Sequence, residues 1–131
     1  MVGRAIAGNT SFELSTREIE RTGPTFTIDS VREFQREQPA EHFVLLLGSD
    51  AFNGMQTWRD FQELLTLIDL VVANRPGVEL QTIPGAHLTV IESEMFAISS
   101  TEIRHAAKTG ADLSPFVPDE IIDDVKRIYG A

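Results

Sequence analysis

Apolar residues change their spacing along the chain, and each spacing predicts an element. After Thr25 they recur about three residues apart, which predicts a helix that runs to about Gln38 and is closed by Pro39. The stretch His42–Leu47 is a continuous apolar run of strand length. Such a run is typical of a strand covered on both faces of a parallel sheet, and Leu70–Ala73 repeats it.

Turn residues and shorter apolar runs predict the remaining elements. In chain order these are the end of a helix over Met1–Gly8, a short strand over Phe12–Leu14, a polar loop over Arg17–Pro24, a helix capped by Thr57 with apolar residues from Trp58 to Ile68, strands over Val78–Ile83 and Leu88–Ile91, and a final helix with Pro118 in its first turn. Helices that alternate with buried strands predict an α/β fold with a mostly parallel sheet. Ligands of such sheets bind beyond the carboxyl ends of the strands. The loops Gly48–Trp58, Asn74–Gly77 and Ala97–Ser100 are therefore expected to share one edge.

The stretch Ile98–Arg104 combines a helix start with the features of an anion site. Ser99 and Glu102 have the spacing of a capping box, and the helix that follows is expected to end at Gly110. The early N–H groups and the dipole of a helix also favour an anion, and Arg104 offers a forked donor about one turn in. Structural capping and phosphate binding both stay open for this stretch.

Composition narrows the classes of function. A length of 131 residues without internal linkers or repeats predicts a single domain over residues 1–131. The formal charge of −9 argues against non-specific binding to nucleic acid or to anionic membranes. There is no membrane-length apolar run and no secretory signal, so a cytoplasmic location is expected. The absence of cysteine excludes disulfides and thiolate metal sites, and the histidines His42, His87 and His105 show no metal-ligand spacing.

Four residues can carry ligand chemistry, and each also has a structural interpretation. Asp50 can accept hydrogen bonds from a ribose or can be a turn aspartate, and Trp58 can stack on a base or belong to the core. Thr27 can bind substrate or cap a helix. Arg75 can meet a phosphate or can be a solvated turn residue. Neither of the two commonest glycine-rich phosphate loops occurs in the chain.

Several segments nevertheless occur together in a fixed order. They are Gly23-Pro24-Thr25-Phe26-Thr27-Ile28-Asp29, Gly48-Ser49-Asp50, Thr57-Trp58, Asn74-Arg75-Pro76-Gly77, Ile98–Arg104 and the ending Phe116-Val117-Pro118-Asp119. In this order they closely resemble the bacterial nicotinate-mononucleotide adenylyltransferases. The resemblance covers essentially the whole chain, and its more specific signals are the Gly-Pro-Thr-Phe-Thr segment and the threonine–tryptophan pair.

The resemblance implies a Rossmann-like domain that transfers AMP from ATP to nicotinate mononucleotide. The products would be nicotinate adenine dinucleotide and pyrophosphate, in NAD biosynthesis, with Mg²⁺ accompanying ATP. By the same resemblance, Ser99, Ser100 and Arg104 would hold the ATP phosphates. The pyridine nucleotide would be bound by Thr27, Asp50, Thr57, Trp58 and Arg75. Assembly into a homo-oligomer stays open.

One family feature is not found in this sequence. The family opens with a first strand, a glycine-rich turn and a His-x-Gly-His motif that clamps the phosphates, and no such motif occurs here. Met1 aligns within a helix downstream of that motif, so the N-terminal strands are expected to be missing and no catalytic residue is assigned. Two hypotheses follow: part of an adenylyltransferase without its N-terminal third, or a complete, non-catalytic nucleotide-binding or assembly module. An uncapped helix at Met1 favours the first.

Overall fold

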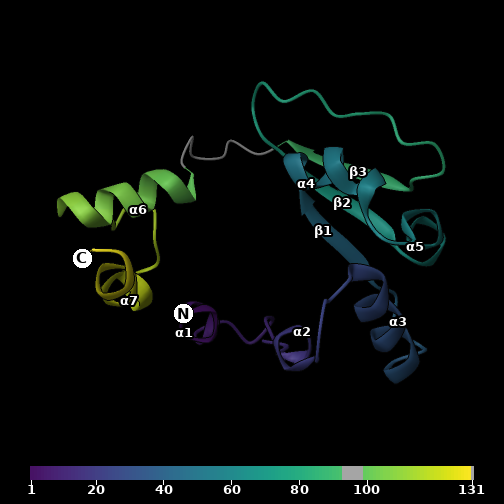
Figure 1. Ribbon diagram of the computed structural model, residues 1–131, viewed down its shortest axis with the longest axis horizontal. Helices are drawn as coiled ribbons and strands as arrows, with labels where there is room; N and C mark the ends of the chain where they lie inside the picture. Colours follow the sequence, from purple (N-terminus) through teal and green to yellow (C-terminus); the bar gives the residue numbers. More distant parts are fainter. Residues whose placement is uncertain (93–98, 131) are drawn as a thin grey trace. The chain divides into compact units, whose positions relative to one another are not determined.

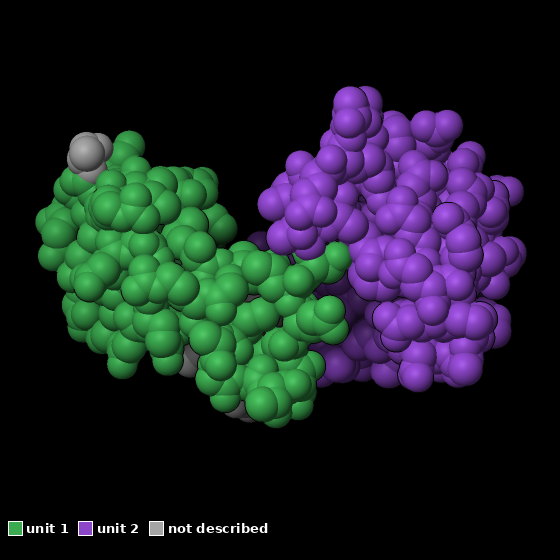
Figure 2. All heavy atoms as spheres, turned by 90° about the horizontal axis from the view of Figure 1, so that it is seen from below, with its two compact units in different colours: residues 1–15, 96–131 green, residues 16–95 purple. Residues whose placement is uncertain are grey.

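A computed structural model describes residues 1–92 and 99–130, which form two compact units (Figures 1 and 2). The strand unit comprises Thr16–Met95, and the terminal unit combines Met1–Ser15 with Phe96–Ala131. The predicted motif residue Ile98, and Ala97 of the predicted edge loop, lie outside the described residues.

The strand unit is a parallel sheet with helices in its connections. Its elements are α2 (Arg17–Glu20), α3 (Thr27–Glu37), β1 (Val44–Gly48), α4 (Ser49–Gly54), the 3₁₀ helix η1 (Met55–Thr57), α5 (Phe61–Leu67), β2 (Asp69–Asn74) and β3 (Leu88–Glu92). The strands lie in the order β1-β2-β3, and both pairs are parallel. Leu70 of β2 is the register partner of both Leu45 and Leu88. The predicted α/β fold with a parallel sheet is confirmed.

Helical spacing and strand alternation together build the core of this unit. Ile28 of α3 and Leu64 of α5 are fully buried, as expected from the apolar faces of these helices. They share one cluster with Leu47, Leu70 and Val72 of the sheet. Because strand side chains alternate between faces, these three residues fix which face of the sheet packs against the helices.

The other face of β1 differs from the prediction. Val44 is 47% exposed and Leu46 is 67% exposed, so the expectation of cover on both faces is wrong for the described residues. Alternation turns Leu45 and Leu47 toward the core and their neighbours toward the opposite face, which the described residues leave exposed. A continuous apolar run therefore predicted the strand correctly but not its burial.

Three local predictions also fail. Phe12–Leu14 is not a strand, and the predicted loop Arg17–Pro24 begins with the short helix α2. Val78–Ile83 is not a strand either, because its backbone pairs with a side chain of α4. Asn53 donates from Nδ2 to the carbonyl of Glu79 (2.9 Å) and accepts at Oδ1 from the amide of Gln81 (2.9 Å).

Three helices lie among the described residues of the terminal unit: α1 (Val2–Ile6), α6 (Ser100–Thr109) and α7 (Asp119–Tyr129). Its small core is formed by Ala107, Leu113, Val117 and Val125. Gly110 ends α6 in the left-handed conformation at φ +72°, as predicted. Among the residues that the structure describes, no helix has the length and apolar character needed to span a membrane.

Candidate functional site

The carboxyl ends of β1 and β2 bring two predicted residues into contact. Arg75, which directly follows β2, donates from Nη1 to Oδ2 of Asp50 in the first turn of α4 (3.1 Å). The amide of Arg75 also donates to Oγ of Ser49, which is fully buried (3.4 Å). Two of the three predicted edge loops, Gly48–Trp58 and Asn74–Gly77, therefore share one edge, as expected.

Asn74 adds an unsatisfied acceptor to this edge. Its Nδ2 donates to Oε1 of Glu92, its register partner in β3 (3.4 Å), whereas its shielded Oδ1 has no hydrogen-bond partner among the residues that the structure describes. A buried acceptor without a donor costs about 1–3 kcal/mol.

Thr27 opens α3 but does not cap it. Phe26 occupies the N-cap position, and no side-chain hydrogen bond caps the helix, so the capping interpretation of Thr27 is wrong. Thr27 instead lines an apolar cavity of about 230 Å³, which it shares with Val31 and Phe34 of α3 and with Val44 of β1. Its substrate-binding interpretation stays a prediction.

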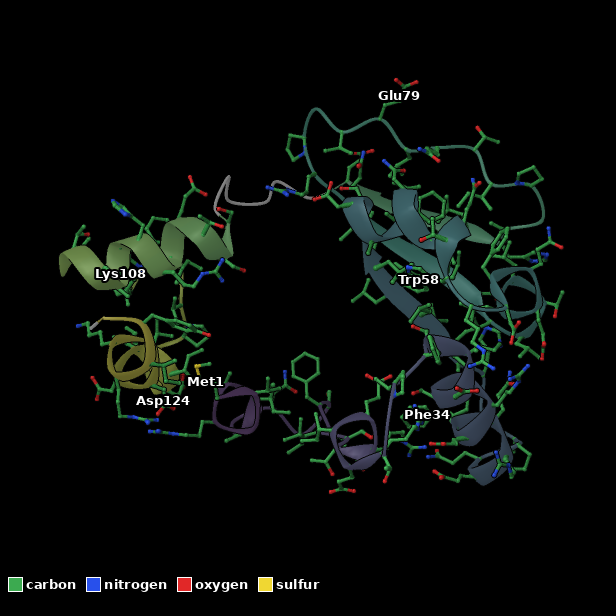
Figure 3. All side chains as sticks on the ribbon, viewed as in Figure 1. Met1, Phe34, Trp58, Glu79, Lys108 and Asp124 are labelled. Atoms are coloured by element: carbon green, nitrogen blue, oxygen red, sulfur yellow. The ribbon has the colours of Figure 1, made fainter. Side chains whose placement is uncertain are left out.

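Thr57 and Trp58 form a corner between η1 and α5. The hydroxyl of Thr57 donates to the carbonyl of Gly54 (2.8 Å), so Thr57 does not cap α5. Asp60 takes the N-cap position at φ +51°, and α5 begins at Phe61, three residues later than predicted. Trp58, labelled in Figure 3, is half-buried and packs against the core, which leaves part of the residue accessible.

The predicted capping box forms at the start of α6. Oγ of Ser99 accepts from the Glu102 amide (3.2 Å), and the Glu102 carboxylate accepts from the Ser99 amide (2.6 Å) and hydroxyl (2.7 Å). The polar groups of Ser99 are thus engaged locally. Ser100 and Arg104 are exposed, and Arg104 donates from Nη2 to Oγ1 of Thr101 (3.2 Å).

Ser100 and Arg104 also border a cavity within the terminal unit. Its volume is about 390 Å³, and its wall is mostly apolar, with residues from all three helices. Ile103, Phe116 and Tyr129 are among them. An apolar cavity with one guanidinium at its border suits a ligand that joins an apolar ring to an anionic group.

Two histidines that are distant in sequence meet at the opposite, amino-terminal edge of the sheet. Nε2 of His42 lies 3.1 Å from Oδ2 of Asp69, and Nδ1 of His87 lies 3.7 Å from Oδ1 of the same carboxylate. Sequence spacing could not show this, because parallel strands bring together residues that are far apart along the chain. Within residues 1–92 and 99–130, no group of three or more histidine, aspartate or glutamate side chains could hold a metal ion.

Of the five residues predicted for the pyridine nucleotide, only Asp50 and Arg75 are joined by a hydrogen bond within the described residues. Sequence reasoning placed Ser49 and Asn74 in the loops of this edge but did not name them as site residues. Their positions at the ends of β1 and β2 were the available signal, since parallel strands place such residues together.

A family model supplies the decisive comparison. The model described as cytidylyltransferase-like matches residues 1–106. The chain belongs to the cytidylyltransferase-like family. This membership agrees with the parallel sheet and with a ligand edge at the carboxyl ends of its strands.

Curated relatives within this family share one name. Proteins of Tropheryma whipplei (strain Twist), Nocardioides sp. and Methylibium petroleiphilum are each named "Probable nicotinate-nucleotide adenylyltransferase". They are 33%, 37% and 37% identical to this chain over 94%, 90% and 97% of its length. The aligned parts are 66%, 60% and 62% of those proteins, so the chain spans less than two thirds of their length.

Solved structures show the same fold. Two structures of Plasmodium falciparum nicotinic acid mononucleotide adenylyltransferase are similar to this chain. The complex with NaAD has a TM-score of 0.65 and 20% identity, and the match covers 95% of this chain and 70% of that chain. The complex with APC has a TM-score of 0.62 and 21% identity, and the match covers 82% of this chain and 61% of that chain. At these identities the likeness establishes the fold alone.

Proposed function

We propose that this chain is the nucleotide-binding part of an enzyme that transfers AMP from ATP to nicotinate mononucleotide. The products are nicotinate adenine dinucleotide and pyrophosphate, in NAD biosynthesis. The observation that carries the proposal is the contact between Arg75 and Asp50 at the carboxyl edge of the sheet. It joins two residues that the family resemblance assigns to the pyridine nucleotide, in the place where parallel α/β sheets bind ligands. The shared name of the curated relatives supports the same activity.

On the pyridine side, each residue has a role that its chemistry allows. Arg75 offers a permanent cation to an anionic group of the mononucleotide, and Asp50 accepts hydrogen bonds from ribose hydroxyls. The accessible part of Trp58 stacks on the pyridine ring. Thr27 and Thr57 supply hydroxyl groups at the starts of α3 and of the η1–α5 corner.

On the ATP side, the start of α6 binds phosphate. Ser100 and Arg104 are exposed and ready for this role. Ser99 can join them only when the Glu102 carboxylate releases its hydroxyl and amide, because Glu102 now accepts from both. Binding of ATP and opening of the capping box are therefore coupled in this proposal.

In the reaction, a phosphate oxygen of the mononucleotide attacks the α-phosphorus of ATP, and pyrophosphate leaves. Such phosphoryl chemistry depends mainly on positioning and on charge neutralisation. Within the described residues, no group of three or more acidic or histidine side chains could hold a metal ion. Magnesium would be carried by the phosphates of ATP, as is usual for this ion.

The His-x-Gly-His motif that the resemblance places in the catalytic role does not occur in this chain. We infer that the complete reaction needs a segment that carries this motif. The absence of this motif also favours the competing function, a non-catalytic nucleotide-binding or assembly module. A cytoplasmic location, where ATP is supplied, belongs to the proposal, and oligomeric state stays open.

The test compares two proteins: the 131-residue chain, and the product of any in-frame coding sequence that extends it upstream. Each is incubated with ATP, nicotinate mononucleotide and Mg²⁺, and the dinucleotide is quantified by chromatography. We expect the dinucleotide from a longer protein that contains His-x-Gly-His and none from the 131-residue chain. A longer protein that carries the motif and yields no dinucleotide would favour the non-catalytic module.

A further inference from the structure

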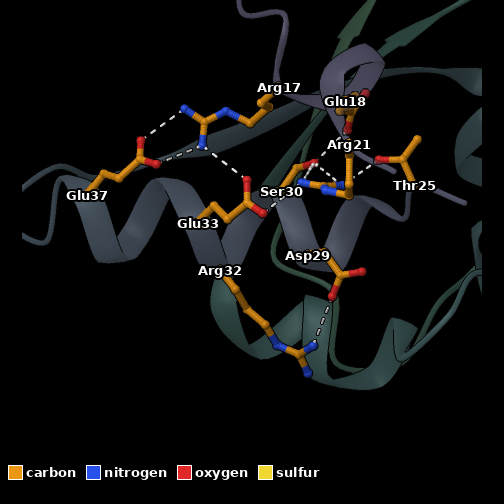
Figure 4. A network of polar contacts seen from close by, with 9 residues as sticks. All are labelled: Arg17, Glu18, Arg21, Thr25, Asp29, Ser30, Arg32, Glu33 and Glu37. Atoms are coloured by element: carbon orange, nitrogen blue, oxygen red, sulfur yellow. Dashed lines mark hydrogen bonds and ion pairs between the residues drawn. The ribbon is translucent and has the colours of Figure 1, made fainter. Parts of the chain in front are cut away.

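Arg21 makes polar contacts with Thr25, in the Gly23–Thr27 segment, and with α3 (Figure 4). Its Nη1 donates to the hydroxyl of Thr25, and both Nη atoms donate to Oγ of Ser30 at 3.4 Å. Its Nη2 lies 2.9 Å from Oε1 of Glu33. The Arg21 side chain is only 19% exposed. One guanidinium therefore ties the segment before α3 to the first two turns of that helix.

The groups around Arg21 are themselves held in place. Ser30 is buried, and its hydroxyl donates to Oε1 of Glu18 on α2 (2.7 Å). Oε2 of Glu33 also forms an ion pair with Nη1 of Arg17 of α2 (3.5 Å). Glu33 thus pairs directly with the Arg21 guanidinium, and Glu18 holds the Ser30 hydroxyl that the guanidinium contacts. Hydrogen bonds from a charged donor are stronger than neutral ones.

The segment that Arg21 holds needs such support. Gly23 adopts φ +85°, a conformation that other residues rarely take. The following residues lead directly to Phe26 at the N-cap position and Thr27 in the first turn of α3. A loop that is ordered before the ligand arrives costs less entropy when the ligand binds. Contacts that order this loop should therefore increase the affinity for the ligand.

We propose that Arg21 is a positioning residue for the mononucleotide site. It fixes Gly23–Thr27 so that Thr27 is presented to the pyridine nucleotide, and this inference rests on the proposed function. The planar fork of arginine is required, because it reaches Thr25, Ser30 and Glu33 at once, whereas a lysine ammonium is a single point charge.

Arg32 of α3 offers a matched control. It also uses a fork, donating from Nε (3.2 Å) and Nη2 (2.7 Å) to the carboxylate of Glu63 on α5. Its described hydrogen bonds go to Glu63 and Asp29, not to the segment before α3. Arg32→Lys therefore removes a comparable forked contact without releasing that segment.

The experiment measures dissociation constants for nicotinate mononucleotide by calorimetry, with urea unfolding of each variant as the stability readout. The variants of the 131-residue chain are Arg21→Lys, Thr25→Val, the double variant and Arg32→Lys. We expect Arg21→Lys to weaken mononucleotide binding about tenfold, as for loss of one charge-assisted hydrogen bond. Thr25→Val should weaken it in the same direction, and the double variant should be no weaker than Arg21→Lys alone. Arg32→Lys should bind like the wild type.

Two results would overturn the inference. One is wild-type affinity in Arg21→Lys, and the other is a loss of affinity in both lysine variants that simply follows their loss of stability. If the wild-type chain shows no saturable binding of the mononucleotide, the proposed function itself fails and the inference fails with it. If the wild type binds the mononucleotide and Arg21→Lys binds it with equal affinity, only the role of Arg21 is rejected and the proposed function stands.

Discussion

Arg75 Nη1 lies 3.1 Å from Asp50 Oδ2, and this ion pair links the residues that follow β2 and β1. Both side chains are well exposed, at 45% for Arg75 and 74% for Asp50. An exposed pair of this kind is worth only about 0–1 kcal/mol of stability. The pair is thus better placed to meet a ligand than to hold the fold together.

Arg75→Gln separates binding from stability. We expect the free energy of unfolding to change by less than about 1 kcal/mol, because the pair is exposed. Affinity for nicotinate mononucleotide should fall about tenfold or more, because a cation that faces an anionic ligand is lost. Urea unfolding and calorimetric titration of the same variant measure the two quantities. Unchanged affinity would make the pair a surface feature.

Trp58 provides an optical signal, since it is the only tryptophan in the chain. Stacking of the pyridine ring on its accessible part should quench its emission when nicotinate mononucleotide is added. Trp58→Phe keeps an aromatic ring in the core and should retain most of the affinity, whereas Trp58→Ala should lose affinity for the mononucleotide and leave ATP binding nearly unchanged. Emission that does not respond to saturating mononucleotide would return Trp58 to a purely structural role.

The sequence predicted best where one local signal decides the structure. The capping box at Ser99 and Glu102 formed as expected, because both partners lie within one helical turn. The strands β1 and β2 were also found, since a long apolar run has few other stable solutions in a small α/β unit. These predictions required no knowledge of distant residues.

The sequence predicted less where a distant group competes for the backbone. Val78–Ile83 has the composition of a strand, but Asn53 takes up its backbone groups at Glu79 and Gln81. Thr57 was expected to cap α5, yet its hydroxyl turns back to Gly54. Asp60, three residues before Glu63, was the stronger signal for the start of that helix. The support of Gly23–Thr27 by Arg21 depends on Ser30 and Glu33, and no local pattern indicates it.

The start of α6 allows a contrast between capping and phosphate binding. Ser99→Ala should destabilise the terminal unit by about 1 kcal/mol, because it removes an N-cap that the structure shows in use. Arg104→Ala should leave the free energy of unfolding nearly unchanged, since Arg104 is exposed. It should weaken the binding of ATP more than the binding of nicotinate mononucleotide. Urea unfolding and titration with both ligands test this contrast. Equal losses for the two ligands would remove Arg104 from the ATP site.

Asp124 of α7 should make the terminal unit sensitive to acid. Its carboxylate accepts from Arg127 (2.9 Å) and from Arg4 of α1 (2.8 Å). The Arg127 hydrogen bond, with the charges of Arg4 and Arg127, lowers the pKa of Asp124 below its ordinary value. At acidic pH the Asp124 carboxylate therefore binds a proton more readily in the unfolded chain than in the folded one. The contribution of Asp124 is present above about pH 4 and is lost as the pH falls through its folded-state pKa.

Asp124→Asn tests this linkage. The variant should be less stable than the wild type at pH 7, and its stability should fall less steeply below about pH 4. The exposed neighbour Asp123, changed to asparagine, is the control and should keep the wild-type slope. Urea unfolding between pH 2.5 and 7 supplies the measurement (about five pH values suffice to define the slope). Identical slopes for Asp124→Asn and the wild type would contradict the lowered pKa.

Binding of nicotinate mononucleotide to the 131-residue chain, measured by isothermal calorimetry, tests the central claim most directly. The proposed site predicts saturable binding of one mononucleotide per chain. That binding should be weakened in Asp50→Ala and in Trp58→Ala and retained in Asp112→Ala, a change in the terminal unit at a residue that is not assigned to any ligand. No saturable heat at millimolar mononucleotide, or equal affinity in all of these variants, would contradict a pyridine-nucleotide site at the carboxyl edge of the sheet.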